Sequence, residues 1–524
     1  MQKTWYAIVA LVVLGASAVG ASALAGKVLG QRLSQQTAQL EKLLPHGGGI
    51  HPKVKRGLFS STRDLTIPLG CAAPTKTAAN AEPQPQVPIA LQWHDTIKHG
   101  PFPSGQALAL AVIDSELLVP ADWQTSWLGD QPLLTIHTKV GFDGGFASTL
   151  RMPAIKHTGE ANIAFSGLTF VVTGTYPAST GTVTYQGSVA PLSFTADAGE
   201  STLALHVGDT RLKGSTQIAA NAATWLLPFK HETSIAELAL QLVPPRASGR
   251  AGQPMNVTIG ELTTTSESRI DSQLWSNTNT LRGRVQVDDF ALDHAEMTVA
   301  LRRLHMPTLE KLLNTLIEAS VSCDPNHGDK PRFGDLAALA STGFELLLHE
   351  PEYEVGPMAI EFAGKRAELS YGVSVHGVTP GDQQLPWVAL LMQRAKAHVE
   401  LKAHLGLIEE LAKFGSKVAD DASAVAAHHM ADVADVADVP AVAVVADHEN
   451  ALEQPAQVAP KPLHPEQVAL AARTMVDKFV DDGYLVREGD YVRSRFETSS
   501  GVFKLNGKPF SLPNLGELAP GGNP

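Results

Sequence analysis

Apolar residues recur at every second position through much of this chain, and this alternation restricts the fold more than any other feature. Between Leu134 and Phe142, for example, Leu134, Ile136 and Val140 fall on one face, and polar residues stand between them. Such strands have one apolar face, and turns such as Asp143-Gly144-Gly145 favour hairpins, so the sequence predicts a large antiparallel sheet. The same alternation marks residues 168–172, 183–189, 203–207, 285–287, 297–301 and 369–375.

Three segments have helical spacing instead, and the predicted fold class is therefore α+β, mainly β. An apolar stripe of Leu and Ile follows Pro307 and predicts a helix near 307–321. From 387 to 413, positions that include Leu391, His398 and Leu405 alternate three and four apart, which is typical of a helix seam that packs internally or across a dimer. A last helix is predicted from Pro465 to a glycine cap at Gly483. Strands follow it, with a hairpin at Asn506-Gly507.

The N-terminus carries an uncharged apolar run from Thr4 to Gly26, bounded by Lys3 and Lys27. As a helix it would reach about 34 Å, enough to cross a bilayer. Trp5 and Tyr6 favour the membrane interface at its head, and the lysine before them favours a cytoplasmic start. The sequence thus predicts a transmembrane anchor with the bulk of the chain exported. The alternative is a cleaved signal peptide, because Ala23-Leu24-Ala25 fits a cleavage site.

These patterns divide the chain into four parts. Residues 1–45 are the predicted anchor and juxtamembrane helix, and residues 46–415 are the predicted β-rich body with helices near 307–321 and 387–413. Residues 416–461 consist almost wholly of Ala, Val, Asp, Pro and His, which is typical of a flexible low-complexity insertion. Residues 462–524 are predicted to complete the body with a helix and hairpins.

Charge and cysteine content exclude several classes of protein. The 41 Lys and Arg against 53 Asp and Glu give a net charge of -12, which argues against a nucleic-acid partner because phosphate binding needs concentrated positive charge. The two cysteines, Cys71 and Cys323, can form at most one disulfide and have no metal-type spacing. An exported compartment permits that disulfide without implying it.

Four segments resemble the YdgA-like family, a bacterial domain of unknown function found in Gram-negative envelopes. They are Lys55-Arg56-Gly57-Leu58-Phe59-Ser60-Ser61, the stretch His94–Pro103 that ends in His-Gly-Pro-Phe-Pro, Asp482-Gly483-Tyr484-Leu485 and Leu505-Asn506-Gly507-Lys508. The resemblance implies an inner-membrane protein with one N-terminal anchor and a periplasmic body, and it allows a homodimer. It brings no catalytic residues, and the insertion at 416–461 departs from the family pattern.

A search for catalytic signatures finds no nucleophile elbow, zinc-protease motif, P-loop or dinucleotide fingerprint. We therefore predict no enzyme, no cofactor and no metal. The segment that stands out is His94, Asp95 and His99 followed by Pro101 and Phe102. A stiff structural turn is the first interpretation of it, a partner-binding loop the second and a metal site the third.

Three functions remain open at this point. The first is a membrane-anchored, periplasmic, non-enzymatic binding or scaffold protein of the cell envelope, with an envelope protein or a second copy as partner. The second is a carrier that binds lipid or another apolar ligand in a groove of the sheet, and the third is a hydrolase whose site the sequence does not reveal. A sealed sheet favours the first function, because an exposed apolar surface promotes aggregation unless something covers it.

Overall fold

A computed structural model describes most of the predicted body. The described residues are 53–56, 60–71, 88–99, 103, 109–120, 127–159, 161–176, 181–199, 201–217, 226–243, 254–321, 336–416 and 464–510. The predicted anchor with Trp5, Tyr6 and Lys27 lies outside them, as do Cys323 and residues 417–461 of the predicted insertion. Across the described ranges, no helix is both long enough and apolar enough to cross a bilayer.

Within the described residues, 24 strands join in a single antiparallel sheet, so the prediction of a mainly β fold with a large antiparallel sheet is confirmed. The strands are β1 Lys53–Arg56, β2 Ser60–Cys71, β3 Pro88–His99, β4 Ala111–Leu118, β5 Leu134–Val140, β6 Gly145–Met152, β7 Ile155–His157, β8 Asn162–Phe165, β9 Leu168–Thr175, β10 Thr182–Val189, β11 Leu192–Asp197, β12 Thr202–Val207, β13 Thr210–Gln217, β14 Phe229–Val243, β15 Met255–Asp271, β16 Leu274–Val287, β17 Phe290–His305, β18 Glu352–Phe362, β19 Lys365–Val375, β20 Ala395–His404, β21 Val486–Glu488, β22 Tyr491–Ser499, β23 Val502–Leu505 and β24 Lys508–Pro509.

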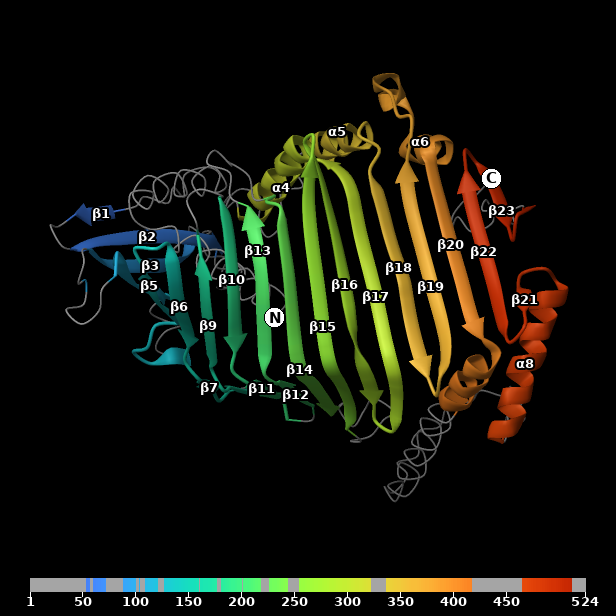
Figure 1. Cartoon of the computed structure of the whole chain (residues 1–524), viewed down its shortest axis with the longest axis horizontal. Coiled ribbons are helices and arrows are strands. Elements are labelled where there is room, and N and C mark those ends of the chain that lie inside the picture. The colour runs from blue at the N-terminus through green and yellow to red at the C-terminus, as the bar shows by residue number, and fades with distance from the viewer. Residues whose placement is uncertain are drawn as a thin grey trace, which may run out of the picture.

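The sheet is a meander in which strands pair with their neighbours along the chain. From β1 to β6, and again from β14 to β20, each strand pairs with the next. Between these runs, four long strands are each interrupted and so consist of two short strands in line. These consecutive halves are β6 and β7, β8 and β9, β10 and β11, and β12 and β13. The last two halves pair with the two ends of β14. Figure 1 shows the resulting row of strands. β22 and the hairpins that it forms lie at the C-terminal end of this row.

The breaks keep most of the apolar side chains on one face of the sheet. The last apolar residue of one half and the first of the next stand three positions apart along the chain, not the two of a regular strand, as with Phe165 and Leu168 or Val189 and Leu192. The same spacing occurs in β15, where Glu261 has a positive φ of 53° beside the register shift. Each extra residue returns the apolar side chains that follow it to the same face of the sheet, which is also the effect of a β-bulge. We call this side the apolar face and the other side the polar face.

At the N-terminal side, the apolar face is closed into a core. Figure 1 shows β2 and β3 passing behind β6, β9 and β10 at a steep angle. The strands therefore coil, and their apolar face lines the inside of the coil. Two glycines mark the tight packing there, because a Cβ at Gly174 would meet the Phe146 ring and one at Gly214 would meet the Tyr185 ring. The core consists of Leu65, Leu91, Trp93, Leu117, Val119, Leu134, Ile136, Phe146, Leu150, Val172 and Val183.

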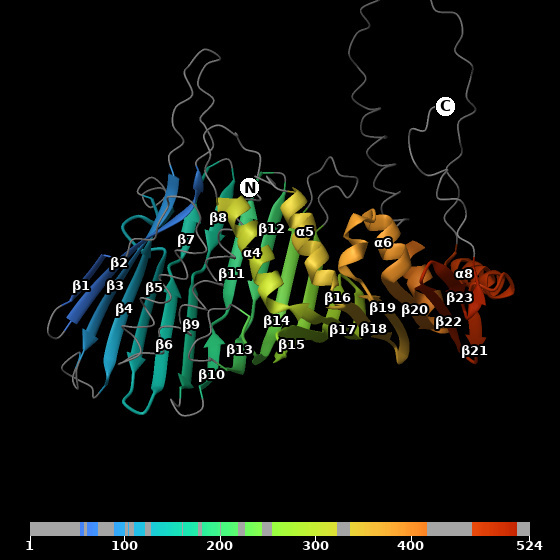
Figure 2. The same cartoon turned by 90° about the horizontal axis from the view of Figure 1, so that it is seen from above.

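Helices lie at both ends of the C-terminal strands. Figure 2 shows α4 Met306–Val321, α5 Leu336–Leu347 and α6 Trp387–Arg394 on one side of the sheet. Phe344 of α5 and Leu390 of α6 pack on Val375, which belongs to the apolar face of β19. At the opposite end of the strands, helical residues 405–416 and α8 Pro465–Asp481 pack on Ala403 and Val492. The helices expected near 307–321 and after Pro465 are confirmed.

The single helix predicted over 387–413 is wrong. The segment contains α6, then strand β20, then helical residues 405–416. Ala397, Val399, Leu401 and Ala403 alternate with polar residues, and β20 takes its backbone partners from β19 and β22. Pairing on both sides outweighs the helical spacing of the seam. His398 therefore lies on the polar face, with its ring over Gly372.

Candidate functional site

The apolar face stays open in the middle of the C-terminal strands. One register row crosses five strands through Leu281, Met297, Met358, Leu369 and Leu401. With neighbouring strands about 4.8 Å apart, this row spans about 19 Å. Leu281, Met297 and Leu401 are each 37–38% exposed, and Met358 and Leu369 are half-buried.

Two further rows widen this surface. One of them runs through Val299, Val355, Tyr371, Val399 and Phe496; in it Val399 is exposed and Val355 is buried. Tyr353 and Val373 lie in the next row, and both are exposed. We call these three rows the apolar band. Scattered exposed apolar side chains are normal in proteins, but a contiguous patch of this kind marks an interaction site.

The helices limit the band at both ends of the strands. At one end α5 and α6 cover Val375 and Ala395, which continue the apolar faces of β19 and β20. At the other end the Phe414 ring stacks on Phe290, with centroids 4.3 Å apart, and Phe290 stacks on Phe362. The band is thus the part of this face that the described helices leave uncovered.

The polar face behind the band is saturated with ion pairs. Arg282 lies 2.8 Å from Glu296, Arg302 lies 2.6 Å from Glu354, and Arg493 lies 2.9 Å from Glu400. Burial acts to raise the pKa of Glu296, but hydrogen bonds and charge from Arg282 and His294 outweigh it and lower that pKa. Over the described residues, the same strands therefore present a solvated side that carries ion pairs and an opposite side whose exposed surface is uncharged.

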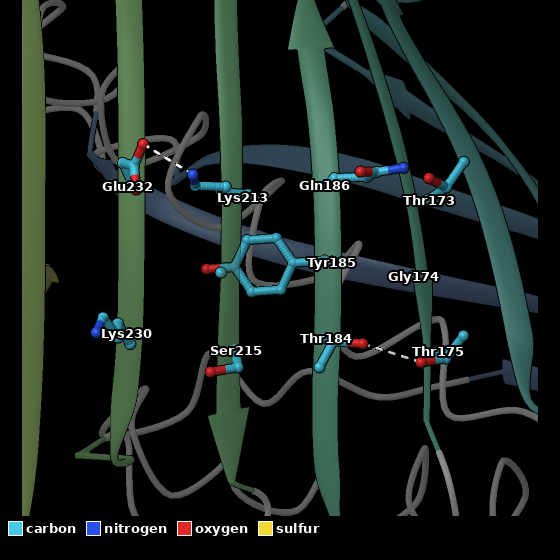
Figure 3. A pocket seen from close by; sticks show the side chains of 11 residues that line it. Thr173, Gly174, Thr175, Thr184, Tyr185, Gln186, Lys213, Ser215, Lys230 and Glu232 are labelled. Atoms are coloured by element: carbon cyan, nitrogen blue, oxygen red, sulfur yellow. Dashed lines mark hydrogen bonds and ion pairs between the residues drawn. The ribbon is translucent and has the colours of Figure 1, made fainter.

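A hollow lies on the polar face over β9, β10, β13 and β14, with a volume of about 580 Å³. Figure 3 shows Lys213 beside Glu232, at 3.0 Å, and Thr175 beside Thr184, at 2.9 Å. An adjoining hollow of about 440 Å³ shares part of this lining. Exposed hydroxyl and charged groups line it and several of them satisfy one another, so nothing in its geometry selects one polar ligand over another.

The segment singled out in the sequence is divided by the sheet. His94 and Asp95 lie inside strand β3 and not in a loop, so they point to opposite faces. On the polar face, His94 Nδ1 lies 2.6 Å from Asp64 Oδ1. His99 is the last residue of β3, and Pro101 and Phe102 lie outside the described residues.

Asp95 is a buried structural anchor. Only 1% of it is exposed, and its carboxylate accepts hydrogen bonds from Arg63 Nε at 2.6 Å, Trp93 Nε1 at 2.7 Å and Ser115 Oγ at 2.6 Å. These donors come from three adjacent strands. Because every acceptor atom is engaged inside the core, Asp95 holds β2, β3 and β4 together and offers no oxygen to a ligand. In the part of the chain described here, no group of His, Cys, Asp or Glu could hold a metal ion.

Comparison with known proteins places the chain in a family. A family model described as bacterial protein of unknown function (DUF945) matches residues 1–513. The chain belongs to this family. No curated protein and no solved structure matches the chain. The narrower YdgA-like resemblance stays a prediction, since no named relative carries it.

A pair of stacked histidines joins the helices to the sheet and gives a prediction about pH. The rings of His305 and His349 lie 3.8 Å apart, and His305 Nδ1 lies 2.8 Å from Thr308 Oγ1. Burial, followed by the His305 charge, lowers the pKa of His349; Arg303 adds to this and Glu345 opposes it. Folding therefore favours the neutral ring, whose contribution to stability is complete above the usual pKa of 6.5 and is lost as pH falls through the lowered value.

We expect the free energy of unfolding to decrease as pH is lowered from 6.5, and His349→Phe to make this decrease smaller. The phenyl ring keeps the stacking surface but takes up no proton. Denaturant unfolding of both proteins at a series of pH values measures the difference. Identical pH slopes for the two proteins would show that His349 does not contribute.

Proposed function

We propose that this protein is a membrane-anchored, periplasmic, non-enzymatic binding protein whose apolar band holds the hydrocarbon chain of a lipid. The observation that carries the proposal is the exposed row from Leu281 to Leu401, which crosses five strands without a charged side chain. Burying apolar surface of this kind contributes about 25 cal/mol per Å² to binding. A ligand that covers the band therefore gains affinity over the whole row.

The chemistry of the band favours hydrocarbon over an extended peptide. Its backbone groups are already used in ladders with both neighbouring strands, so they have no hydrogen bonds to offer. A peptide laid across it would lose water from its own N–H and C=O groups without compensation. A hydrocarbon chain has no such groups. The two methionines, Met297 and Met358, add adaptable side chains that tolerate chains of different shape.

The location is supported by the N-terminus and by the family resemblance. The uncharged run Thr4–Gly26 has the length of a bilayer span, with Trp5 and Tyr6 at its head. The YdgA-like resemblance implies the same arrangement, with the body in the periplasm. An anchored body beside the inner membrane would have lipid available at high local concentration.

Photolabelling tests the proposal on the full chain in lipid nanodiscs. A palmitic acid that carries a photoactivatable diazirine is added, the sample is irradiated, and labelled peptides are mapped by mass spectrometry. We expect adducts on peptides of β16–β20 that unlabelled fatty acid removes. Labels confined to the N-terminal segment, or spread evenly over peptides of the whole sheet, would contradict the proposal.

One observation favours a protein partner as a second candidate function. Three large apolar side chains of α8 are exposed, Leu470, Met475 and Phe479, while Val476 packs inward. Exposed apolar side chains of this kind fit a scaffold role, with an envelope protein or a second copy as partner. Cross-linking of the full chain in nanodiscs tests it: a dimer or hetero-complex linked through α8 supports the role, and its absence counts against it.

A further inference from the structure

The helix α6 closes one end of the apolar band and exposes its own apolar side. Leu390 is 1% exposed and packs with Phe344, Val375 and Val378. Trp387, Val388, Leu391 and Met392 lie on the outer side, where Val388 is 75% exposed. The helix is thus apolar on both sides, and only one side is covered by the described residues.

The structure holds this outer side in a fixed orientation. Arg394 at the end of α6 lies 3.2 Å from Asp382 Oδ2, and Thr379 N donates to the same oxygen at 2.9 Å. The backbone hydrogen bond from Thr379 lowers the pKa of Asp382, and Arg394 adds to this effect. The pair ties α6 to the 3₁₀ helix Pro380–Gln384 before it, so α6 cannot turn its exposed side toward the sheet.

We propose that the outer side of α6 inserts into the surface of a phospholipid bilayer and places the end of the apolar band against it. This rests on the proposed function, since it gives the lipid a path from the membrane to the band. The four exposed side chains include a tryptophan, which favours the interface, and the exposed Lys396 near the start of β20, close to the end of α6, offers a cation to headgroup phosphates.

The tether permits this contact. The predicted span ends near Lys27, and the first described strand begins at Lys53. The 25 residues between them reach up to about 90 Å when extended. The anchor therefore does not restrict which end of the sheet faces the membrane. The apolar side of α6 supplies that preference.

Site-specific photo-crosslinking tests the inference on the full chain. Val388 is replaced by p-benzoylphenylalanine, which keeps the native cysteines, and the protein is reconstituted in vesicles of phosphatidylethanolamine and phosphatidylglycerol. The matched control carries the same probe at Leu470 of α8, which is 66% exposed and lies at the opposite end of the strands. We expect phospholipid adducts at 388 well above those at 470. Met392→Asp should lower the adducts at 388 roughly tenfold, and Met392→Leu should preserve them.

The outcomes separate this inference from the proposed function. Equal adduct yields at 388 and 470, or a protein dimer cross-linked through 388 in place of lipid, would overturn the membrane contact. If the diazirine fatty acid labels β16–β20 while 388 gives no lipid adduct, the proposed function stands and the role of α6 fails. If 388 captures lipid but the band is not labelled, α6 contacts the bilayer and the proposed function fails.

Discussion

Replacing Asp95 by alanine is expected to lower the free energy of unfolding by about 3–5 kcal/mol. The substitution leaves the Arg63 guanidinium, whose side chain is 14% exposed, without its partner inside the core. It also removes the acceptor for Trp93 Nε1 and Ser115 Oγ. Guanidinium unfolding of the full chain in mild detergent, followed by circular dichroism, measures the change.

The neighbouring pair on the polar face provides the control. Asp64→Ala removes the contact with His94, but both side chains are well exposed to water, so the expected loss is below about 1 kcal/mol. Replacing both core partners, Arg63→Met with Asp95→Leu, should recover much of the stability lost in Asp95→Ala, since no unpaired charge then remains. A loss in Asp95→Ala no larger than that in Asp64→Ala would show that the buried pair is not an anchor.

The alternation of apolar residues predicted the sheet because its physical cause is local. A strand such as β5 shows buried positions at Leu134, Ile136, Thr138 and Val140 in strict order, and the turn residues after it favour a hairpin. A meander needs only such hairpins, repeated along the chain. The interruptions of the strands also have a local cause, since the spacing of three positions between Phe165 and Leu168 is visible in the sequence.

Residues with two competing periods could not be assigned in this way. In β20 Leu401 fits both a helical seam and a strand face, and its pairing with Leu369 on β19 and Ser494 on β22 decides between them. Those partners are about 30 and 90 residues distant, so no local window contains the information. The helix α5 was missed for a related reason, because its Ala-rich start has no polar stripe and its packing partner is Val375.

The candidate site shows the same limit. Sequence reasoning selected His94 and Asp95 as neighbours, but a strand sends adjacent side chains to opposite faces, and only Asp95 enters the core. Of the apolar band, only the residues in 297–301 and 369–375 were identified as one face of a sheet, whereas Val399 and Leu401 were assigned to a helix. Whether that face is covered depends on where α5, α6, α8 and residues 405–416 pack, which is a tertiary property. Alternation predicts an apolar face and carries no signal for its exposure.

Placing a charge in the band by Leu401→Asp is expected to raise the diazirine fatty acid concentration needed for half-maximal labelling by more than about 100-fold. Leu401 is 37% exposed, so in the free protein the new carboxylate stays hydrated and the fold is preserved. When hydrocarbon covers the row, the carboxylate loses that water and no donor on the apolar face replaces it. Quantitative mass spectrometry of β17–β19 peptides measures the shift.

Two matched variants show whether the effect belongs to the band. Leu401→Met keeps an apolar side chain of similar volume and should leave labelling unchanged. Lys402→Gln alters the next residue, which points to the polar face beside Tyr491, and should also leave it unchanged. Since residues 401 and 402 share one strand, a general disturbance of β20 would affect both variants alike. Equal labelling of Leu401→Asp and Lys402→Gln would therefore place the hydrocarbon somewhere other than the apolar band.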